Sequence, residues 1–218
     1  MNLIYCYDAY CGWCYGFSPI IKRVSEEYKN LFHTEVLSGG MILPETPTHI
    51  GTMANYILKA YKTVEDYSGI KFGKDYLWHI ENPDLSDWFP NSEKPAIALC
   101  IFKEFFPEQQ TAFASDLQYA LHYEGRDLTD DAAYEHLLEK YNINKITFYE
   151  KLHSETYTDK AKYEFALCKQ LQVSGYPCVL MQVNESKFFL LAKGFTTYDD
   201  LKARIDNVLK ELENNATN

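Results

Sequence analysis

The first forty residues show two kinds of hydrophobic pattern. Residues 2–7 are almost continuously apolar, which is typical of a buried strand. Between Phe17 and Leu31 apolar residues recur at helical spacing, and residues 34–38 then alternate as a strand does. The pattern predicts strand, helix and strand, and a crossover of this length favours a parallel pair of strands.

From about residue 45 to 155 apolar residues recur at helical spacing, without a strand pattern. Pro95 and Pro107 fit the first turns of two helices, and Thr129 fits the cap of a later one. The stretch from Gly73 to Pro95 is expected to be a loop. We therefore interpret residues 45–155 as an all-helical insertion domain.

The pattern then returns to a mixture of helix and strand. One more helix precedes two strands, 178–183 and 187–192, which are expected to form an antiparallel hairpin. A capping-box spacing at Thr197 begins a last helix. The chain is thus predicted to be an α/β protein whose first domain is discontinuous and consists of residues 1–44 and 156–218.

Charge and composition narrow the possible partners. The 218 residues include 21 lysines and arginines against 31 aspartates and glutamates, so the formal net charge is −10. An acidic chain without a basic patch is a poor ligand for nucleic acid or for an anionic membrane. The N-terminus lacks the features of a signal peptide, and no run of 18 apolar residues is present. We expect a chain that starts inside its first strand and is located in the cytoplasm.

The candidate chemistry is a pair of cysteines, Cys11 and Cys14, where the first strand gives way to the first helix. Amide groups at a helix N-terminus have no intrahelical partner, and the helix dipole adds partial positive charge. Both effects favour the thiolate, which is the nucleophile of sulfur chemistry. Cys14 follows one turn later and can close a small disulfide ring. The other cysteines are single and have apolar neighbours, as buried core cysteines do: Cys6, Cys100, Cys168 and Cys178.

Two structural roles compete with redox chemistry for this pair. A structural zinc site needs about four ligands, but there is no second cysteine pair and the six histidines are dispersed. A stable disulfide across so short a loop would add little stability, because it removes little entropy from the unfolded chain. We therefore predict a redox-active dithiol and no metal site.

Four sequence features together resemble one family. They are Cys11-Gly12-Trp13-Cys14 after the first strand, Gly39-Gly40 after the second, Asn91-Ser92 before an insert helix, and residues 173–177 (Val-Ser-Gly-Tyr-Pro) before the hairpin. The chain resembles the DsbA-like thioredoxin superfamily, and within it the FrnE-related branch of predicted disulfide isomerases and dithiol oxidoreductases. The resemblance implies a thioredoxin fold interrupted by an all-helical insert.

The same resemblance implies a substrate groove beside the dithiol. Pro177 would follow a cis peptide bond and face the dithiol, and the backbone of Tyr176 would pair with an extended peptide. Cys178, next to Pro177, is open to two interpretations, as a third thiol near the site or as a core residue on the far face of the sheet, and alternation along the strand favours the far face. Trp13 has two open interpretations, as a cover for Cys14 or as a flat contact for the substrate. The remaining residues expected to border the groove are Gly12, Tyr10 and Met41.

The predicted function is a thiol–disulfide oxidoreductase or isomerase that acts on protein or small-molecule disulfides. The Cys11 thiolate would attack a substrate disulfide and Cys14 would resolve the mixed disulfide, or the reverse sequence would oxidise a substrate dithiol. Gly12-Trp13 lacks the Pro-His dipeptide of DsbA, so we expect a less oxidising couple. Asp8 would oppose the thiolate if it lies close, or would cap the helix and point away. No bound cofactor is expected beyond the Cys11–Cys14 disulfide, and glutathione is a candidate reductant.

Two alternatives stay open. The first is a glutathione-dependent isomerase or transferase of the kappa or hydroxychromene carboxylate isomerase type, although that family commonly has a serine where Cys11 stands. The second is a non-catalytic peptide-binding module. The sequence leaves the physiological substrate, the redox partner and the choice between monomer and homodimer undetermined.

Overall fold

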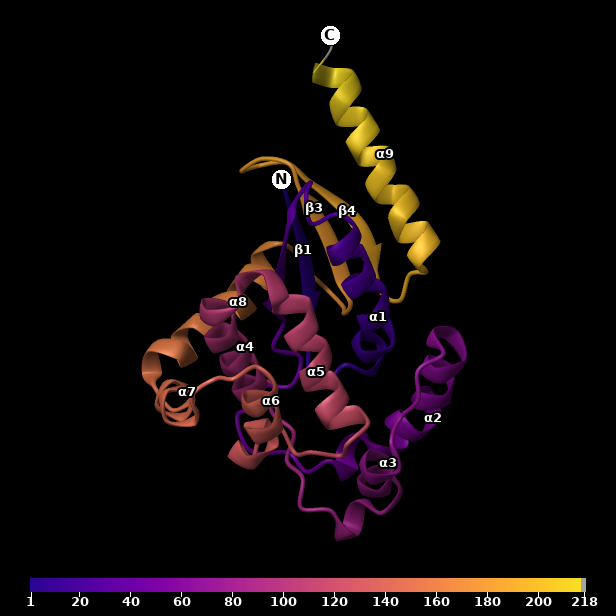
Figure 1. Ribbon diagram of the computed structural model, residues 1–218. Coiled ribbons are helices and arrows are strands. Elements are labelled where there is room, and N and C mark those ends of the chain that lie inside the picture. The colour runs from indigo at the N-terminus through magenta and orange to yellow at the C-terminus, as the bar shows by residue number, and fades with distance from the viewer. Residues whose placement is uncertain (217–218) are drawn as a thin grey trace.

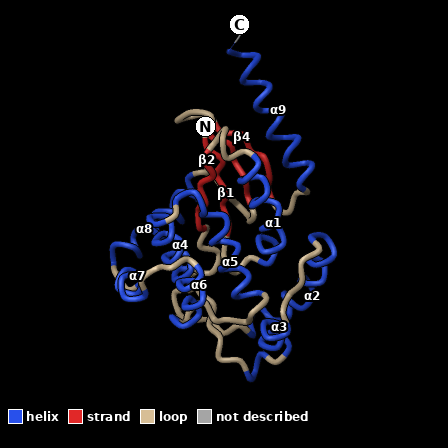
Figure 2. Tube along the Cα trace, in the orientation of Figure 1, coloured by secondary structure: helices blue, strands red, loops and turns tan. Residues whose placement is uncertain are grey.

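A computed structural model describes residues 1–216 and contains one four-stranded sheet (Figure 2). The strands lie in the order β2-β1-β3-β4, and β1 and β2 are parallel while the other pairs are antiparallel. The predicted parallel pair and the predicted hairpin are therefore both confirmed. The bounds are β1 (Asn2–Tyr7), β2 (His33–Ser38), β3 (Cys178–Gln182) and β4 (Phe188–Lys193).

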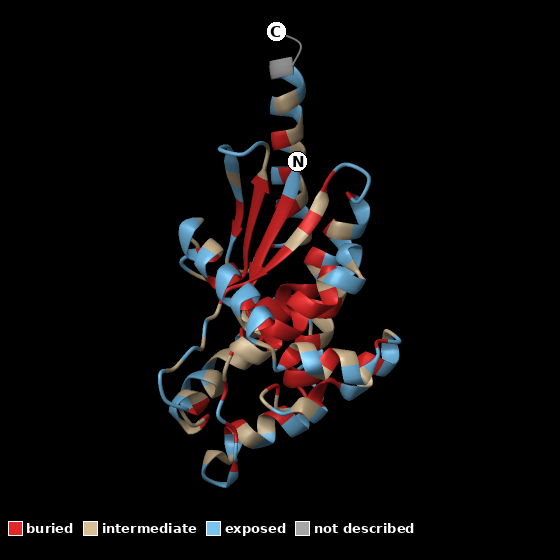
Figure 3. Cartoon of the chain, turned by 90° about the vertical axis from the view of Figure 1, so that its left-hand side faces the viewer, coloured by how far each residue is buried: buried red, intermediate tan, exposed pale blue. Residues whose placement is uncertain are grey.

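The sheet is covered on both faces because successive side chains of a strand point to opposite sides. Leu3, Tyr5 and Tyr7 belong to the large core cluster, whereas Ile4 and Cys6 belong to a smaller one. Helices α1 (Gly12–Glu27) and α9 (Tyr198–Ala216) pack on the first face, and α8 (Glu155–Gln170) packs on the second. The inner strands are consequently buried along most of their length (Figure 3).

The remaining helices gather at one end of the sheet, whereas α9 extends beyond the other end (Figure 1). No strand lies between residues 39 and 177, so the expected α/β fold with a helical insert is confirmed. Helix α5 of the insert packs directly on α1, and the division into two domains stays a prediction. The bounds are α2 (Gly51–Ser68), α3 (Lys74–Glu81), α4 (Glu93–Phe105), α5 (Gln110–His122), α6 (Glu135–Lys140) and α7 (Lys145–Leu152).

The expected loop from Gly73 to Pro95 is wrong in its first half. Helix α3 and a short 3-10 helix, Pro83–Leu85, occupy residues 74–85. Tyr76 and Ile80 lie one turn apart and are both buried, which fixes the helix against the core. Two turns offer only two such apolar positions, too few for a periodic pattern to stand out in sequence.

The predicted cap at Thr129 is also wrong. The hydroxyl and the backbone N–H of Thr129 both donate to the carboxylate of Asp127, which closes a local turn. Asp130 takes the capping role instead, because its side chain accepts from the N–H of Ala132 at the start of the 3-10 helix Asp131–Tyr134. The predicted cap at Thr197 is confirmed, since its hydroxyl oxygen accepts from the N–H of Asp200.

Every helix within residues 1–216 is too short or too polar to cross a bilayer.

Candidate active site

The two cysteines lie at the start of α1, as expected. Cys11 is the N-cap residue and has an extended backbone, and its Sγ accepts a hydrogen bond of 3.3 Å from the N–H of Cys14. All six cysteines are free thiols. Cys11 is 6 % exposed and Cys14 is fully buried. A substrate therefore reaches Cys11 first, with Cys14 behind it.

Burial separates the chemistry of the two thiols. It raises the pKa of Cys14, and the adjacent Cys11 and the Asp8 carboxylate raise it further. Cys14 is consequently held as a neutral thiol until it passes its proton to another group. The buried, neutral thiol of Cys14 thus differs in its surroundings from the thiol of Cys11 at the N-cap.

The loop before β3 faces the dithiol. The Tyr176–Pro177 peptide bond is cis, as the resemblance implied, and the Tyr176 carbonyl accepts from Cys11 Sγ at 3.6 Å. The Tyr176 hydroxyl donates to the carbonyl of Gly39 at 2.9 Å. A Cβ at Gly39 would lie 2.1 Å from Cζ of the Tyr176 ring, so only glycine leaves room for that ring. The end of β2 and the cis loop are thereby fitted together beside Cys11.

Asp8 connects three chain segments by hydrogen bonds at the edge of the site. Its buried carboxylate accepts from the N–H of Tyr10 at 3.0 Å, the N–H of Met41 at 2.7 Å and the hydroxyl of Ser92 at 2.9 Å. Burial raises the pKa of Asp8, although these hydrogen bonds oppose the shift. The interpretation of Asp8 as a helix cap is wrong, because Cys11 occupies that position.

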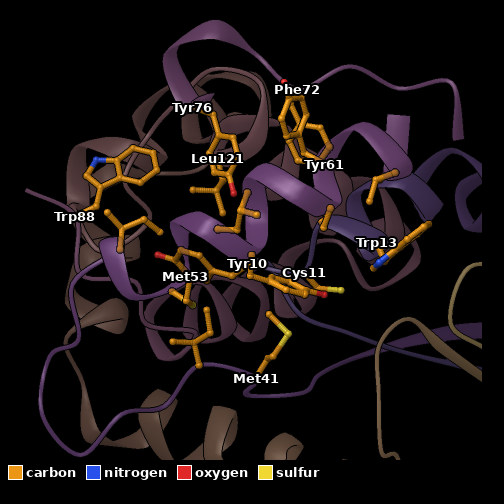
Figure 4. Close-up of a pocket in the computed structure, with 17 residues that line it drawn as sticks. Tyr10, Cys11, Trp13, Met41, Met53, Tyr61, Phe72, Tyr76, Trp88 and Leu121 are labelled. Carbon is orange, nitrogen blue, oxygen red and sulfur yellow. The ribbon is translucent and has the colours of Figure 1, made fainter. Parts of the chain in front are cut away.

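An apolar cavity opens beside Cys11 (Figure 4). Tyr10, Gly12, Trp13 and Met41 line it together with Cys11, so the structure brings these five predicted residues to one place. Trp13 and Trp88 lie at opposite ends of the labelled side chains, and Cys11 lies toward the Trp13 end (Figure 4).

Tyr176 lies outside this cavity. It lines an open cleft on the other side of Trp13, together with Tyr67 and Phe195. The Trp13 ring contacts both of these rings at centroid distances of 6.1 and 6.0 Å, and Trp13 lines both hollows. The expected single groove is thus two hollows with Trp13 between them.

Sequence reasoning missed one wall of the cavity. Helix α2 supplies that wall, because Met53, Ile57 and Tyr61 line the space next to Cys11. Helix α2 approaches α1 closely at Gly16, where a Cβ would lie 2.9 Å from Cγ1 of Val64. The helical spacing gave the apolar face of α2 but not its partner, so no local signal could have found this wall.

The other cysteines lie away from the dithiol. Cys6, Cys168 and Cys178 belong to the cluster on the opposite face of the sheet, as alternation predicted for Cys178. Cys100 is buried on α4, where its thiol contacts Glu164. Within residues 1–216, no group of three or more histidine, cysteine, aspartate or glutamate side chains is arranged to hold a metal ion.

Solved structures with the same fold cover nearly the whole chain. A predicted protein disulfide isomerase from Nitrosomonas europaea superposes with a TM-score of 0.83 at 21% identity, covering 96% of this chain and 98% of that one. The cytosolic disulfide reductase DsbM from Pseudomonas aeruginosa gives 0.75 at 22% identity, covering 96% and 99%. A 2-hydroxychromene-2-carboxylate isomerase gives 0.65 at 12% identity, covering 100% and 98%. At these identities the likeness establishes the fold.

Sequence comparison identifies the family. A search of curated proteins gives no match. The family model of the DSBA-like thioredoxin domain matches residues 3–206, which is nearly the full length. The four-stranded sheet, the dithiol at the start of α1 and the cis-proline loop facing it agree with that match. The chain therefore belongs to the DSBA-like thioredoxin domain family.

Proposed function

We propose that the protein is a thiol–disulfide oxidoreductase that acts through Cys11 and Cys14 on protein or small-molecule disulfides. One observation carries the proposal: a free thiol at the N-cap of α1 faces the Tyr176 carbonyl, and a second, buried thiol follows one turn later. Membership of the DSBA-like family supports this assignment. The likeness to the reductase DsbM is consistent with it.

The proposed reaction passes two electrons from the dithiol to the substrate. The Cys11 thiolate attacks one sulfur of the substrate disulfide, the substrate S–S bond breaks, and the other sulfur leaves as a thiolate that takes up a proton. Cys14 then attacks Cys11 Sγ, the S–S bond between Cys11 and the substrate breaks, and the Cys14 proton goes to the departing substrate sulfur directly or through water. The second substrate thiol is released and the Cys11–Cys14 disulfide remains. An external dithiol or two thiols must return two electrons to restore the starting state.

We infer that this couple works on the reducing or isomerising side. A dithiol becomes a strong oxidant when its reduced form is stabilised, as in DsbA. Here Gly12 and Trp13 bring no charge beside Cys11, so only the N-terminus of α1 favours its thiolate. A cytoplasmic location, as in the cytosolic DsbM, would suit this direction. Glutathione is a candidate reductant, since DsbM has also been solved with it.

A redox titration with glutathione, followed by alkylation and mass mapping, tests the proposal. Cys11 and Cys14 should gain and lose two electrons together, while the other four cysteines stay reduced. In a reductase assay, Cys11→Ser should fall to the uncatalysed rate, and Cys14→Ser should accumulate a mixed disulfide on Cys11. Cys178→Ser, on the far face of the sheet, is the matched control and should keep its activity. A Cys11→Ser variant with full activity would overturn the proposal.

The glutathione-dependent isomerase remains the second candidate, because an apolar cavity adjoins Cys11 and an isomerase shares the fold. It predicts that glutathione binds without forming a Cys11–Cys14 disulfide. A peptide-binding module would instead keep its ligand affinity in Cys11→Ser. The same titration, with a binding measurement on that variant, separates the three functions.

A further inference from the structure

The cavity beside Cys11 is lined mainly by apolar and aromatic side chains, which thiol–disulfide exchange by itself does not need. Its volume is about 130 Å³, and its walls come from α2, from Phe72 and Tyr76, and from Trp88. Within residues 1–216, the side chains that line it include no lysine, arginine, histidine, aspartate or glutamate. An apolar space of this kind selects its occupant by shape and by hydrophobicity.

The volume fits one aromatic ring or one branched apolar group. Engineered protein cavities of roughly 150 Å³ with apolar walls bind benzene. Three aromatic side chains of the wall, Phe72, Tyr76 and Trp88, are buried, so this part of the wall is closed to solvent. Two other lining residues are well exposed, Met41 at 45 % and Tyr56 at 70 %, so the cavity is open to solvent at these side chains.

A charged group would be excluded from the same space. A buried ion without a partner loses its hydration and gains no compensating contact. The carboxylates and ammonium groups of glutathione would find no counter-ion on these walls. The open cleft beyond Trp13 differs, since Asp200 and Arg204 border it. The space that Cys11 itself lines is therefore apolar, whereas the cleft beyond Trp13, which Cys11 does not line, carries charged side chains.

We infer that this cavity is a specificity subsite for an uncharged aromatic or branched apolar group carried close to the disulfide sulfur that Cys11 attacks. The inference rests on the proposed function and names the substrate class for it. Filling the cavity leaves the chemistry as described: the substrate S–S bond breaks, a disulfide bond forms between Cys11 Sγ and the substrate sulfur, and the displaced sulfur leaves as a thiolate that takes up a proton.

Single-turnover reduction of matched disulfides tests the subsite. Benzyl 2-hydroxyethyl disulfide and bis(2-hydroxyethyl) disulfide share one half and differ in the aromatic ring, and glutathione disulfide adds charge. Each rate with the reduced protein is divided by the rate with dithiothreitol, which corrects for intrinsic reactivity. We expect the aromatic disulfide to react at least about tenfold faster than the other two, the scale that one buried apolar group gives.

Two variants of α2 make the test specific. Ala60→Phe places a ring in the cavity and should remove the preference for the aromatic disulfide. Thr63→Phe adds the same ring at an exposed position of the same helix and should leave the preference unchanged. Met53→Ala enlarges the cavity and should favour a naphthylmethyl over a benzyl disulfide, which keeps the test informative if Ala60→Phe does not fold.

Cysteine peptides show whether the apolar group belongs to a protein substrate or to a small molecule. Peptides with one cysteine, capped by 2-mercaptoethanol and flanked by either phenylalanine or serine, are compared in the same way. A preference among the small disulfides supports a small-molecule substrate, and a preference only among the peptides supports a protein side chain. Equal corrected rates in both sets, or a preference that survives in Ala60→Phe, would overturn the subsite while the oxidoreductase stands. If no disulfide reacts with the wild-type dithiol, the proposed function itself fails.

Discussion

At the scale of single residues, the surroundings of the dithiol hold titratable groups away from water. His122 on α5 is buried among the rings of Tyr15, Phe72 and Tyr76, with centroid distances of 5.0 to 5.4 Å. Burial lowers the pKa of His122 to about 3. The imidazole is therefore neutral throughout the physiological range and packs behind the cavity as an aromatic ring.

This shift predicts an acid-sensitive stability. The folded-state pKa of His122 lies below the ordinary value of 6.5, so below pH 6.5 the unfolded chain takes up a proton that the folded chain does not. The His122 contribution to the free energy of unfolding is thus present at pH 8 and falls by about 2 kcal/mol by pH 5. In His122→Phe this part of the pH dependence should vanish. Urea unfolding at both pH values measures it, and an unchanged pH dependence in the variant would contradict the assignment.

At the scale of elements, glycines set how closely the parts of the site approach. Gly16 lets α2 lie against α1, and Gly39 lets the Tyr176 ring cover the end of β2. The first contact positions the cavity wall, and the second positions the carbonyl that accepts from Cys11. The geometry of the site therefore depends on Gly16 and Gly39, because a Cβ at either position would overlap a neighbouring side chain.

Gly39→Ala tests the second contact. The new methyl group would overlap the Tyr176 ring, so the ring and the cis-proline loop must move. We expect a loss of about 1–3 kcal/mol in the free energy of unfolding, the usual range for overpacking. The reaction of Cys11 with a disulfide should also slow, because the Tyr176 carbonyl beside it shifts. In a Tyr176→Ala background the same change should cost much less. An equal cost in both backgrounds would rule out the ring contact as the cause.

At the scale of the whole molecule, a partly buried ion cluster joins helix α4 of the insert and helix α8 to the sheet. Lys103 of α4 contacts Glu164 of α8 at 2.6 Å and Glu35 of β2 at 2.9 Å, and it also donates to the Val36 carbonyl. Glu164 in turn accepts from the N–H of Ser38 at 2.8 Å. Burial alone would lower the pKa of Lys103, but Glu164 and Glu35 hold it above its ordinary value. The cluster fixes two helices to the strand that ends at Gly39.

Removing the Lys103 cation alone should lower the free energy of unfolding far more than removing both Lys103 and Glu164. Lys103→Met leaves Glu164 buried without its partner, and we expect a loss of about 3–5 kcal/mol in the free energy of unfolding. Lys103→Met combined with Glu164→Leu removes both charges and should recover a large part of that loss. Denaturant unfolding of the two variants gives the comparison. If the double variant is as unstable as the sum of the two single variants, the two residues are not coupled.

The sequence by itself determined the elements that have long or strongly marked local patterns. Hydrophobic periodicity predicted the parallel pair, the hairpin and the helical character of the insert, and it missed α3, which has only eight residues. The position of Cys11 at a helix start followed from neighbouring residues alone. These features are local, because strand alternation and helix spacing are set by residues a few positions apart.

Only the tertiary structure decided how the surroundings of the dithiol are built. Asp8 could not be interpreted from sequence, because its partners Met41 and Ser92 lie 33 and 84 positions away. The cavity likewise joins Cys11 to α2 and to Trp88, which no spacing in the sequence connects. Periodicity marks a face as apolar but does not say what covers it. Whether that face becomes core or the wall of a site depends on the packing of distant elements.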